Sequence, residues 1–125
     1  MRTIRFTIPY PTGKGQKAKF CRDYGLNAIY SGKFWAKRNR DKDYWHWMVL
    51  NCLRQQRIKK EIFSKPVSIT FYWDDGLDVD NHAYMGKLIV DTLKGYLIEN
   101  DGKRYVREVV HRFHEGDIVV EVGEV

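Results

Sequence analysis

Two short stretches in which apolar and polar residues alternate limit most strongly what this chain can fold into. One spans residues 2–9 and the other spans residues 67–73. Their apolar members are Ile4, Phe6 and Ile8 in the first, and Val67, Ile69, Phe71 and Trp73 in the second. Alternation with a period of two is typical of a β-strand that packs one face on a core and turns the other to water. The sequence therefore predicts a β-sheet.

Two longer stretches repeat their apolar residues every three or four positions, as amphipathic helices do. The first is expected to begin at Asp41 or Asp43, either of which can cap a helix, and to end near Lys60. The second is expected to run from residue 81 or 82 to 94, with Gly95 as its C-terminal cap. Residues 12–39 contain four glycines and show no periodicity, so we expect a long loop there.

Two further strands are expected near residues 105–113 and 118–122, joined as a hairpin through Glu115 and Gly116. The order is then β-α-β-α-β-β. At 125 residues the chain is long enough for one modest core. We therefore predict an α+β fold, a single domain over residues 1–125 with a mixed four-stranded sheet and two principal helices.

Charge is divided unevenly along the chain. Residues 1–65 carry 16 Lys and Arg against 4 Asp and Glu, whereas residues 66–125 carry 6 against 12. A basic half suits a polyanion such as nucleic acid, and an acidic half suits divalent cations. The cations of the expected loop alternate with aromatic residues that can stack on unpaired bases. We expect DNA contacts from Lys14, Lys17, Lys19, Arg22, Lys33, Lys37, Arg38 and Arg40.

The acidic segment at residues 74–81 holds the most informative cluster. Asp78 and Asp80 are two apart, so in an extended chain both carboxylates point to the same side. A pair of carboxylates in one pocket favours a hard cation, Mg²⁺ or in its place Mn²⁺. Asp101 follows the second expected helix, and a β-α-β return makes it a plausible third ligand.

A metal held by aspartates beside a basic surface is typical of phosphodiester hydrolysis. Lys87 can add positive charge where the phosphate reacts. Asp91 lies roughly 16 Å further along the helix axis than Asp80, too far to share one ion. We expect Asp91 to support the site indirectly or to pair with Lys87, one turn earlier.

These residues resemble the signature of the RusA-type Holliday junction resolvases of bacteria and their phages. The matching positions are Asp78-Val79-Asp80-Asn81, then Lys87, Asp91, Leu93, Gly95, Asp101 and Val106. The resemblance implies a homodimeric crossover junction endonuclease of DNA recombination and repair that cuts four-way DNA. It implies metal ligation by Asp78, Asp80 and Asp101, with Lys87 needed for cleavage and Asn81 supporting the ligands. Lys87 follows the second aspartate by seven residues instead of the usual four, and the basic segment is longer than usual.

The expected partners are thus branched double-stranded DNA and a second copy of the chain, with no membrane. The N-terminus lacks the apolar centre of a signal peptide, so we expect a cytoplasmic protein of bacterial or phage origin. Two other functions remain open from the residues alone. One is a non-catalytic DNA-binding module, and the other is a nuclease for other branched DNA.

Overall fold

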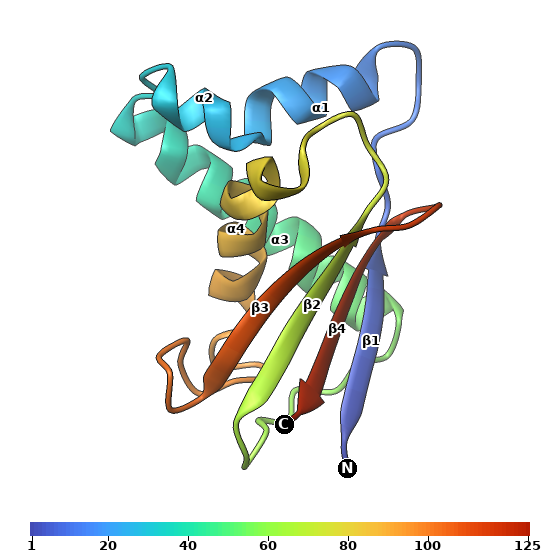
Figure 1. Cartoon of the computed structure of the whole chain (residues 1–125), viewed down its shortest axis with the longest axis vertical. Helices are drawn as coiled ribbons and strands as arrows, with labels where there is room; N and C mark the ends of the chain where they lie inside the picture. Colours follow the sequence, from blue (N-terminus) through green and yellow to red (C-terminus); the bar gives the residue numbers. More distant parts are fainter.

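The sheet and the helices that cover it form two layers in the computed structural model, which describes residues 1–125. The elements in chain order are β1 (Thr3–Ile8), α1 (Gln16–Tyr24), α2 (Leu26–Tyr30), α3 (Trp35–Gln55), β2 (Val67–Trp73), η1 (Val79–His82), α4 (Ala83–Leu93), β3 (Val106–Phe113) and β4 (Ile118–Glu124). The prediction of an α+β domain with a mixed four-stranded sheet is confirmed. Figure 1 shows the helices behind the sheet and above it.

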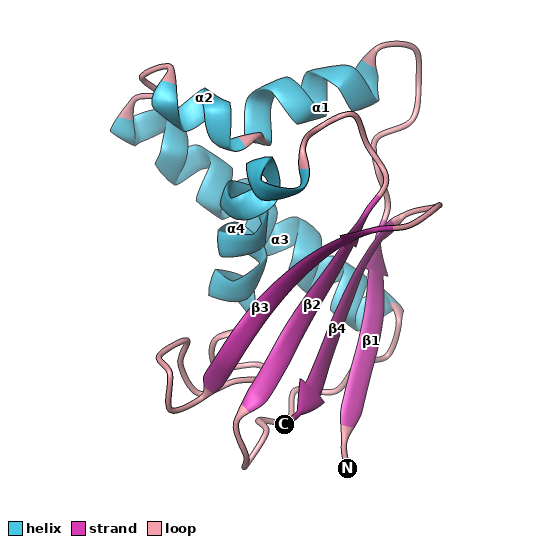
Figure 2. Ribbon diagram, viewed as in Figure 1, coloured by secondary structure: helices cyan, strands magenta, loops and turns pink.

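The strands lie in the order β1-β4-β2-β3. β4 is antiparallel to both of its neighbours, whereas β2 and β3 run parallel because α4 returns the chain between them. The four strands and their helical cover are easiest to follow in Figure 2. The predicted hairpin of the last two strands is wrong, since β2 lies between β3 and β4. The turn that joins them instead crosses the end of β2, where the Gly116 amide donates to Asp74 Oδ2 at 2.9 Å.

The core lies between the sheet and the pair α3 and α4. Every odd residue of β2 is fully buried on this side, which confirms the alternation read from the sequence. Trp45 of α3 and Trp73 of β2 are the largest fully buried side chains. Each buried aromatic ring contributes about 2 to 3 kcal/mol through the apolar area that it removes from water.

The segment expected to be a loop is largely helical, and this is the main correction to the predicted fold. It contains α1, α2 and the first turn of α3, which begins at Trp35 and not at Asp41 or Asp43. Neither α1 nor α3 has a side-chain cap, and the first six residues of α3 are exposed. Without a cap residue or a buried stripe, these turns lack the two signals by which a helix is recognised in a sequence.

Candidate active site

The acidic segment follows β2 directly and leads through the 3-10 turn η1 into α4. Asp78 and Asp80 are exposed there, and the side chain of neither makes a hydrogen bond or an ion pair. Asp78 has an extended backbone, but the next four residues form η1. The expected alternation of side chains therefore ends at Asp78, because a 3-10 helix has three residues per turn. Both carboxylates are nevertheless free to bind a ligand from solvent.

A buried acid lies beneath this exposed pair. The side chains of Asp75 and His82 have no solvent exposure, and His82 Nε2 lies 2.8 and 2.9 Å from the two carboxylate oxygens of Asp75. The Tyr10 hydroxyl donates to the same carboxylate at 2.8 Å, and the Leu77 amide donates to it at 3.0 Å. Asp75 thus ties the first loop of the chain and the acidic segment to the beginning of α4.

Two opposing influences act on the pKa of the Asp75 carboxyl group. Burial raises the pKa of this carboxyl, but the hydrogen bonds from His82, Tyr10 and the Leu77 amide together outweigh burial and hold the pKa below its ordinary value. His82 Nδ1 lies 3.1 Å from the Val79 carbonyl oxygen. The buried His82 ring therefore bridges the Asp75 carboxylate and the Val79 carbonyl oxygen.

An aromatic stack continues inward from this pair. The Trp73 ring lies 4.5 Å from the His82 ring, and the Trp73 indole nitrogen donates to His111 Nδ1 at 3.0 Å. Burial lowers the pKa of His111, and so does the nearby His82. A neutral His111 can accept the indole hydrogen bond, which holds Trp73 against the underside of the acidic segment.

Composition does not distinguish Asp75 from the other aspartates of the segment at residues 74–81, so it is not among the predicted site residues. The alternation of β2 provided a signal. The odd residues of that strand face the core, and Asp75 continues the odd series by one step. An acid that faces the core needs a buried partner, and His82 is one such partner.

The helix pair α1 and α2 packs directly on the acidic segment, as Figure 1 shows. The Asn27 amide donates to Asn81 Oδ1 at 3.0 Å, so Asn81 connects α2 to η1. At Gly25, between the two helices, an added Cβ would lie 2.8 Å from the Cys21 carbonyl oxygen and 3.3 Å from the Leu77 side chain. Only glycine allows this close approach.

The third expected ligand, Asp101, lies elsewhere. Its carboxylate pairs with Lys94 at 3.0 Å and with Lys87 at 3.6 Å, and both lysines also pair with Asp91. The predicted pair of Lys87 with Asp91 is confirmed at 3.0 Å. The hydrogen bond from Lys94 holds the pKa of Asp101 below its ordinary value. Asp101 is thus neutralised near the end of α4 opposite to the one where Asp80 lies.

No three acidic, histidine or cysteine side chains are grouped so that they could hold a metal ion. The expected convergence of Asp78, Asp80 and Asp101 is therefore absent from this conformation of a single chain. Asp101 is instead held by Lys87 and Lys94, whereas Asp80 lies in η1, before α4 begins. Lys87 is likewise directed toward Asp91 and Asp101 because their carboxylates attract its ammonium group.

The expected DNA-binding cations fall into two groups. Lys14, Arg22, Lys37, Arg38 and Arg40 are exposed and make no ion pair. Lys33 is different, because its side chain is only 4% exposed, pairs with Asp41 and donates to the Asp23 carbonyl oxygen at 2.6 Å. Lys19 pairs with Asp23 at 2.7 Å, and Lys17 lies over the Tyr10 ring. Lys33 in particular is a structural residue of the α2–α3 connection.

The aromatic residues of the same segment also divide. Phe20 and Tyr24 pack against Trp45 in the core. Three others surround the α2–α3 connection and project into solvent; they are Tyr30, Phe34 and Trp35, with 78%, 81% and 72% of their surface exposed. We call these three residues the aromatic tip. Arg22 and Lys37 line a small cavity next to it.

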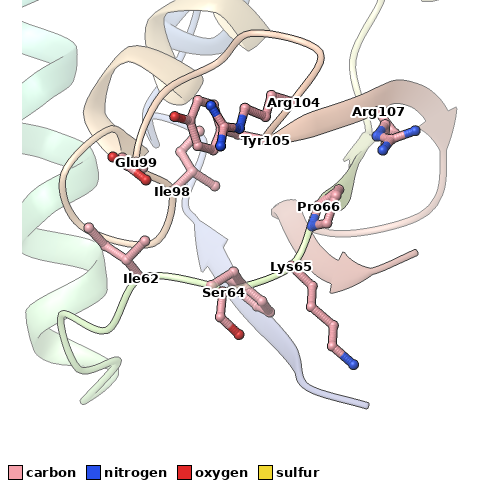
Figure 3. Close-up of a pocket in the computed structure, with 10 residues that line it drawn as sticks. Ile62, Ser64, Lys65, Pro66, Ile98, Glu99, Arg104, Tyr105 and Arg107 are labelled. Atoms are coloured by element: carbon pink, nitrogen blue, oxygen red, sulfur yellow. The ribbon is translucent and has the colours of Figure 1, made fainter.

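A cavity of about 670 Å³ lies away from this site. It lies at the opposite end of the sheet, between the segment that leads into β2 and the segment that leads into β3. Figure 3 shows its lining, in which Arg104 and Tyr105 lie across from Ile62 and Ser64, while the side chain of Lys65 points away. Asp78 and Asp80 do not line this cavity.

No helix of the chain combines the length and the apolar character that crossing a membrane requires. No protein-family model matches the chain, and no curated protein matches its sequence.

Proposed function

We propose that this chain is a Mg²⁺-dependent, structure-selective endodeoxyribonuclease that acts as a homodimer on four-way DNA junctions in recombination and repair. The proposal rests on the resemblance of residues 77–106 to the RusA-type resolvases together with the geometry of the acidic segment. A crossover junction endonuclease of bacterial or phage origin, working in the cytoplasm, fits this pattern.

One observation carries the proposal. Asp78 and Asp80 hold two carboxylates in solvent without a protein partner, on a turn that the buried pair of Asp75 and His82 fixes in place. Unpaired exposed acids on an anchored turn, directly beside a basic helical segment, are poorly explained by stability alone. They are well placed to act on a polyanion that the neighbouring cations hold.

Two of the expected ligands fit Mg²⁺, and the third does not. Mg²⁺ is commonly held by one or two carboxylates, with water and substrate phosphate oxygens completing its shell. Asp78 and Asp80 could supply that pair, whereas Asp101 is occupied by Lys94. When bound, the ion would polarise the phosphate and lower the pKa of a water molecule. The exposed cations Arg22, Lys37, Arg38 and Arg40 would hold the DNA backbone.

The test is the substitution Asp80→Asn, which keeps shape and removes one charge. The variant should bind four-way DNA as the parent does and should lose Mg²⁺-dependent nicking by at least about a hundredfold. Glu99→Gln is the matched control, because Glu99 is an exposed acid at the other end of the sheet. An Asp80→Asn protein that cuts at the parental rate would refute the assignment. Forked and linear DNA in the same assay decide whether four-way junctions are preferred.

A non-catalytic DNA-binding module is the second candidate, and the ion pairs of Asp101 favour it. In that function the acids near α4 serve only to neutralise Lys87 and Lys94. The module predicts tight, salt-sensitive binding of DNA with no cleavage in either Mg²⁺ or Mn²⁺.

A further inference from the structure

We propose that β3 is the surface through which two copies of this chain associate, with the two β3 strands antiparallel across a two-fold axis at Val110. The proposed function includes a homodimer but names no surface for it, and this inference supplies one. Its argument and its test need no DNA, so it can stand or fall separately from the nuclease.

The two edges of the sheet differ in how they are protected. At β1, the Gln56 side chain accepts from the Thr7 amide at 2.8 Å and donates to the Thr7 carbonyl oxygen at 2.7 Å. The glutamine amide therefore imitates a neighbouring strand at Thr7 and occupies the pairing groups of that residue. No side chain or loop hydrogen-bonds to the outer side of β3. An open edge is a template for pairing with another strand.

The direction of the free backbone groups follows from the ladder between β2 and β3. The His114 amide donates to the Trp73 carbonyl oxygen at 2.9 Å, and Trp73 is in register with Phe113. In a parallel ladder, each bonding residue pairs with the residues on either side of its partner. The even residues 108, 110 and 112 therefore bond to β2, while residues 109, 111 and 113 direct their amides and carbonyls outward.

The face of this edge that is turned toward the helices exposes apolar side chains, whereas the opposite face carries charged ones. Val109 is 45% exposed and Phe113 is 53% exposed, although both lie on the face that the helices cover. Beside them runs a groove of about 300 Å³ between α4 and β3, floored by Ala83, Gly86, Val90 and Val106. Figure 1 shows β3 as the outermost strand beside α4. A second strand placed along this edge would cover the groove and both exposed side chains.

The charges on β3 favour one pairing register and favour a second copy of the chain as the partner. With the axis at Val110, Glu108 of each copy lies directly opposite Arg112 of the other, which gives two equivalent pairs of opposite charge. Moving the axis to Val109 or His111 places Glu108 opposite Val110 or His114, and neither charge is then paired. Arg112 makes no ion pair within its own chain. A strand that complements itself in this way is suited to a second copy of the same chain.

Disulfide capture tests the register. Two Val110 residues would face each other across the axis with Cβ atoms about 4.5 to 5.5 Å apart, close enough for a disulfide after a small shift. We expect Val110→Cys to form a covalent dimer under mild oxidation, whereas Arg5→Cys on the opposite edge and the parent chain should not. A dimer that Val110→Cys fails to capture, or that Arg5→Cys captures equally well, overturns the proposal.

Charge reversal tests the partner and keeps the result independent of cysteine chemistry. Glu108→Arg and Arg112→Glu, measured singly by sedimentation, should each weaken self-association by about tenfold or more, because two like-charge pairs replace two favourable ones. The double variant should restore the parental dimer. Both positions are exposed, so circular dichroism should show an unchanged fold. A monomeric parent, or a double variant as weak as either single one, overturns the proposal. A dimer that passes both tests and cuts no DNA refutes only the nuclease.

Discussion

Replacing Asp75 with alanine should destabilise the protein more than any change to the exposed acids, because Asp75 is the single acceptor for three donors. The change leaves the buried His82 ring without its carboxylate partner, and leaves the Tyr10 O–H and the Leu77 amide without an acceptor. Removing one partner of a buried pair costs about 3 to 5 kcal/mol. Domains of this size have a total stability of about 5 to 15 kcal/mol. We therefore expect Asp75→Ala to remove about a fifth or more of the free energy of unfolding.

The assay is urea unfolding followed by tryptophan fluorescence, with the midpoint and slope compared between variants. Asp78→Asn is the matched control, since Asp78 is exposed and unpartnered and should change stability by less than about 0.5 kcal/mol. Asp75→Asn should fall between them, at about 1 to 3 kcal/mol. Its amide oxygen still accepts a hydrogen bond, and its NH₂ group can donate to a neutral His82 ring.

The reasoning would be refuted if Asp75→Ala unfolded within about 1 kcal/mol of the Asp78→Asn control. That result would mean that water or a local rearrangement satisfies His82, and that the acidic segment does not depend on a buried pair. The anchored turn that supports the proposed function would then lose its physical basis.

The buried Asp75–His82 pair and the aromatic tip each give one further prediction. The pKa of Asp75 in the folded protein lies below its ordinary value of 3.8. The stability that ionised Asp75 contributes is therefore complete above that pH and is lost as the pH falls through the lower, folded pKa. The difference in urea midpoint between the parent and Asp75→Ala should be constant above about pH 4 and should shrink below it. Trp35→Ala, in the aromatic tip, should weaken binding of branched DNA by about tenfold through the loss of one stacked base, whereas Trp47→Ala, also exposed on α3, should not. Fluorescence anisotropy with labelled four-way and duplex DNA measures the DNA affinity of both tryptophan variants. Equal losses of affinity in the two variants would contradict a DNA-binding role of the aromatic tip.

The parts of the fold that were predictable are those where burial has a short period along the chain. The odd residues of β2 and the even residues of β1 from Phe6 onward are buried, as alternation indicated. The apolar stripe of α4 also follows from local residues. The cap predicted at Gly95 is one residue off, because Lys94 caps α4 and the Gly95 amide donates to the Ile98 carbonyl oxygen. In these elements the apolar or polar character of each residue matches its burial, so a short stretch of sequence is sufficient to predict the element.

The pairing order of the strands was not predictable from such windows. A turn at Gly116, with a φ of 118°, suits a hairpin equally well whether its strands pair with each other or enclose a third. Only the contacts of β2 with both β3 and β4, far apart in sequence, decide between these arrangements. The same limitation explains Asp101, since its distance from Asp80 depends on how α4 lies across the sheet.

The acidic segment divides by strand parity into two kinds of carboxylate, and composition cannot reveal this. Asp75 continues the buried face of β2 and holds His82, while Asp78 lies beyond the strand, where no such constraint acts. An acid that is anchored inward and an acid that is free outward perform opposite tasks, although the sequence places them three residues apart. The inward acid fixes the turn. Asp78 and Asp80 can therefore stay near the N-terminal end of α4 although no partner holds their side chains. The proposed site would need few residues, because the strand that forms the core also leads into the turn that carries both free acids.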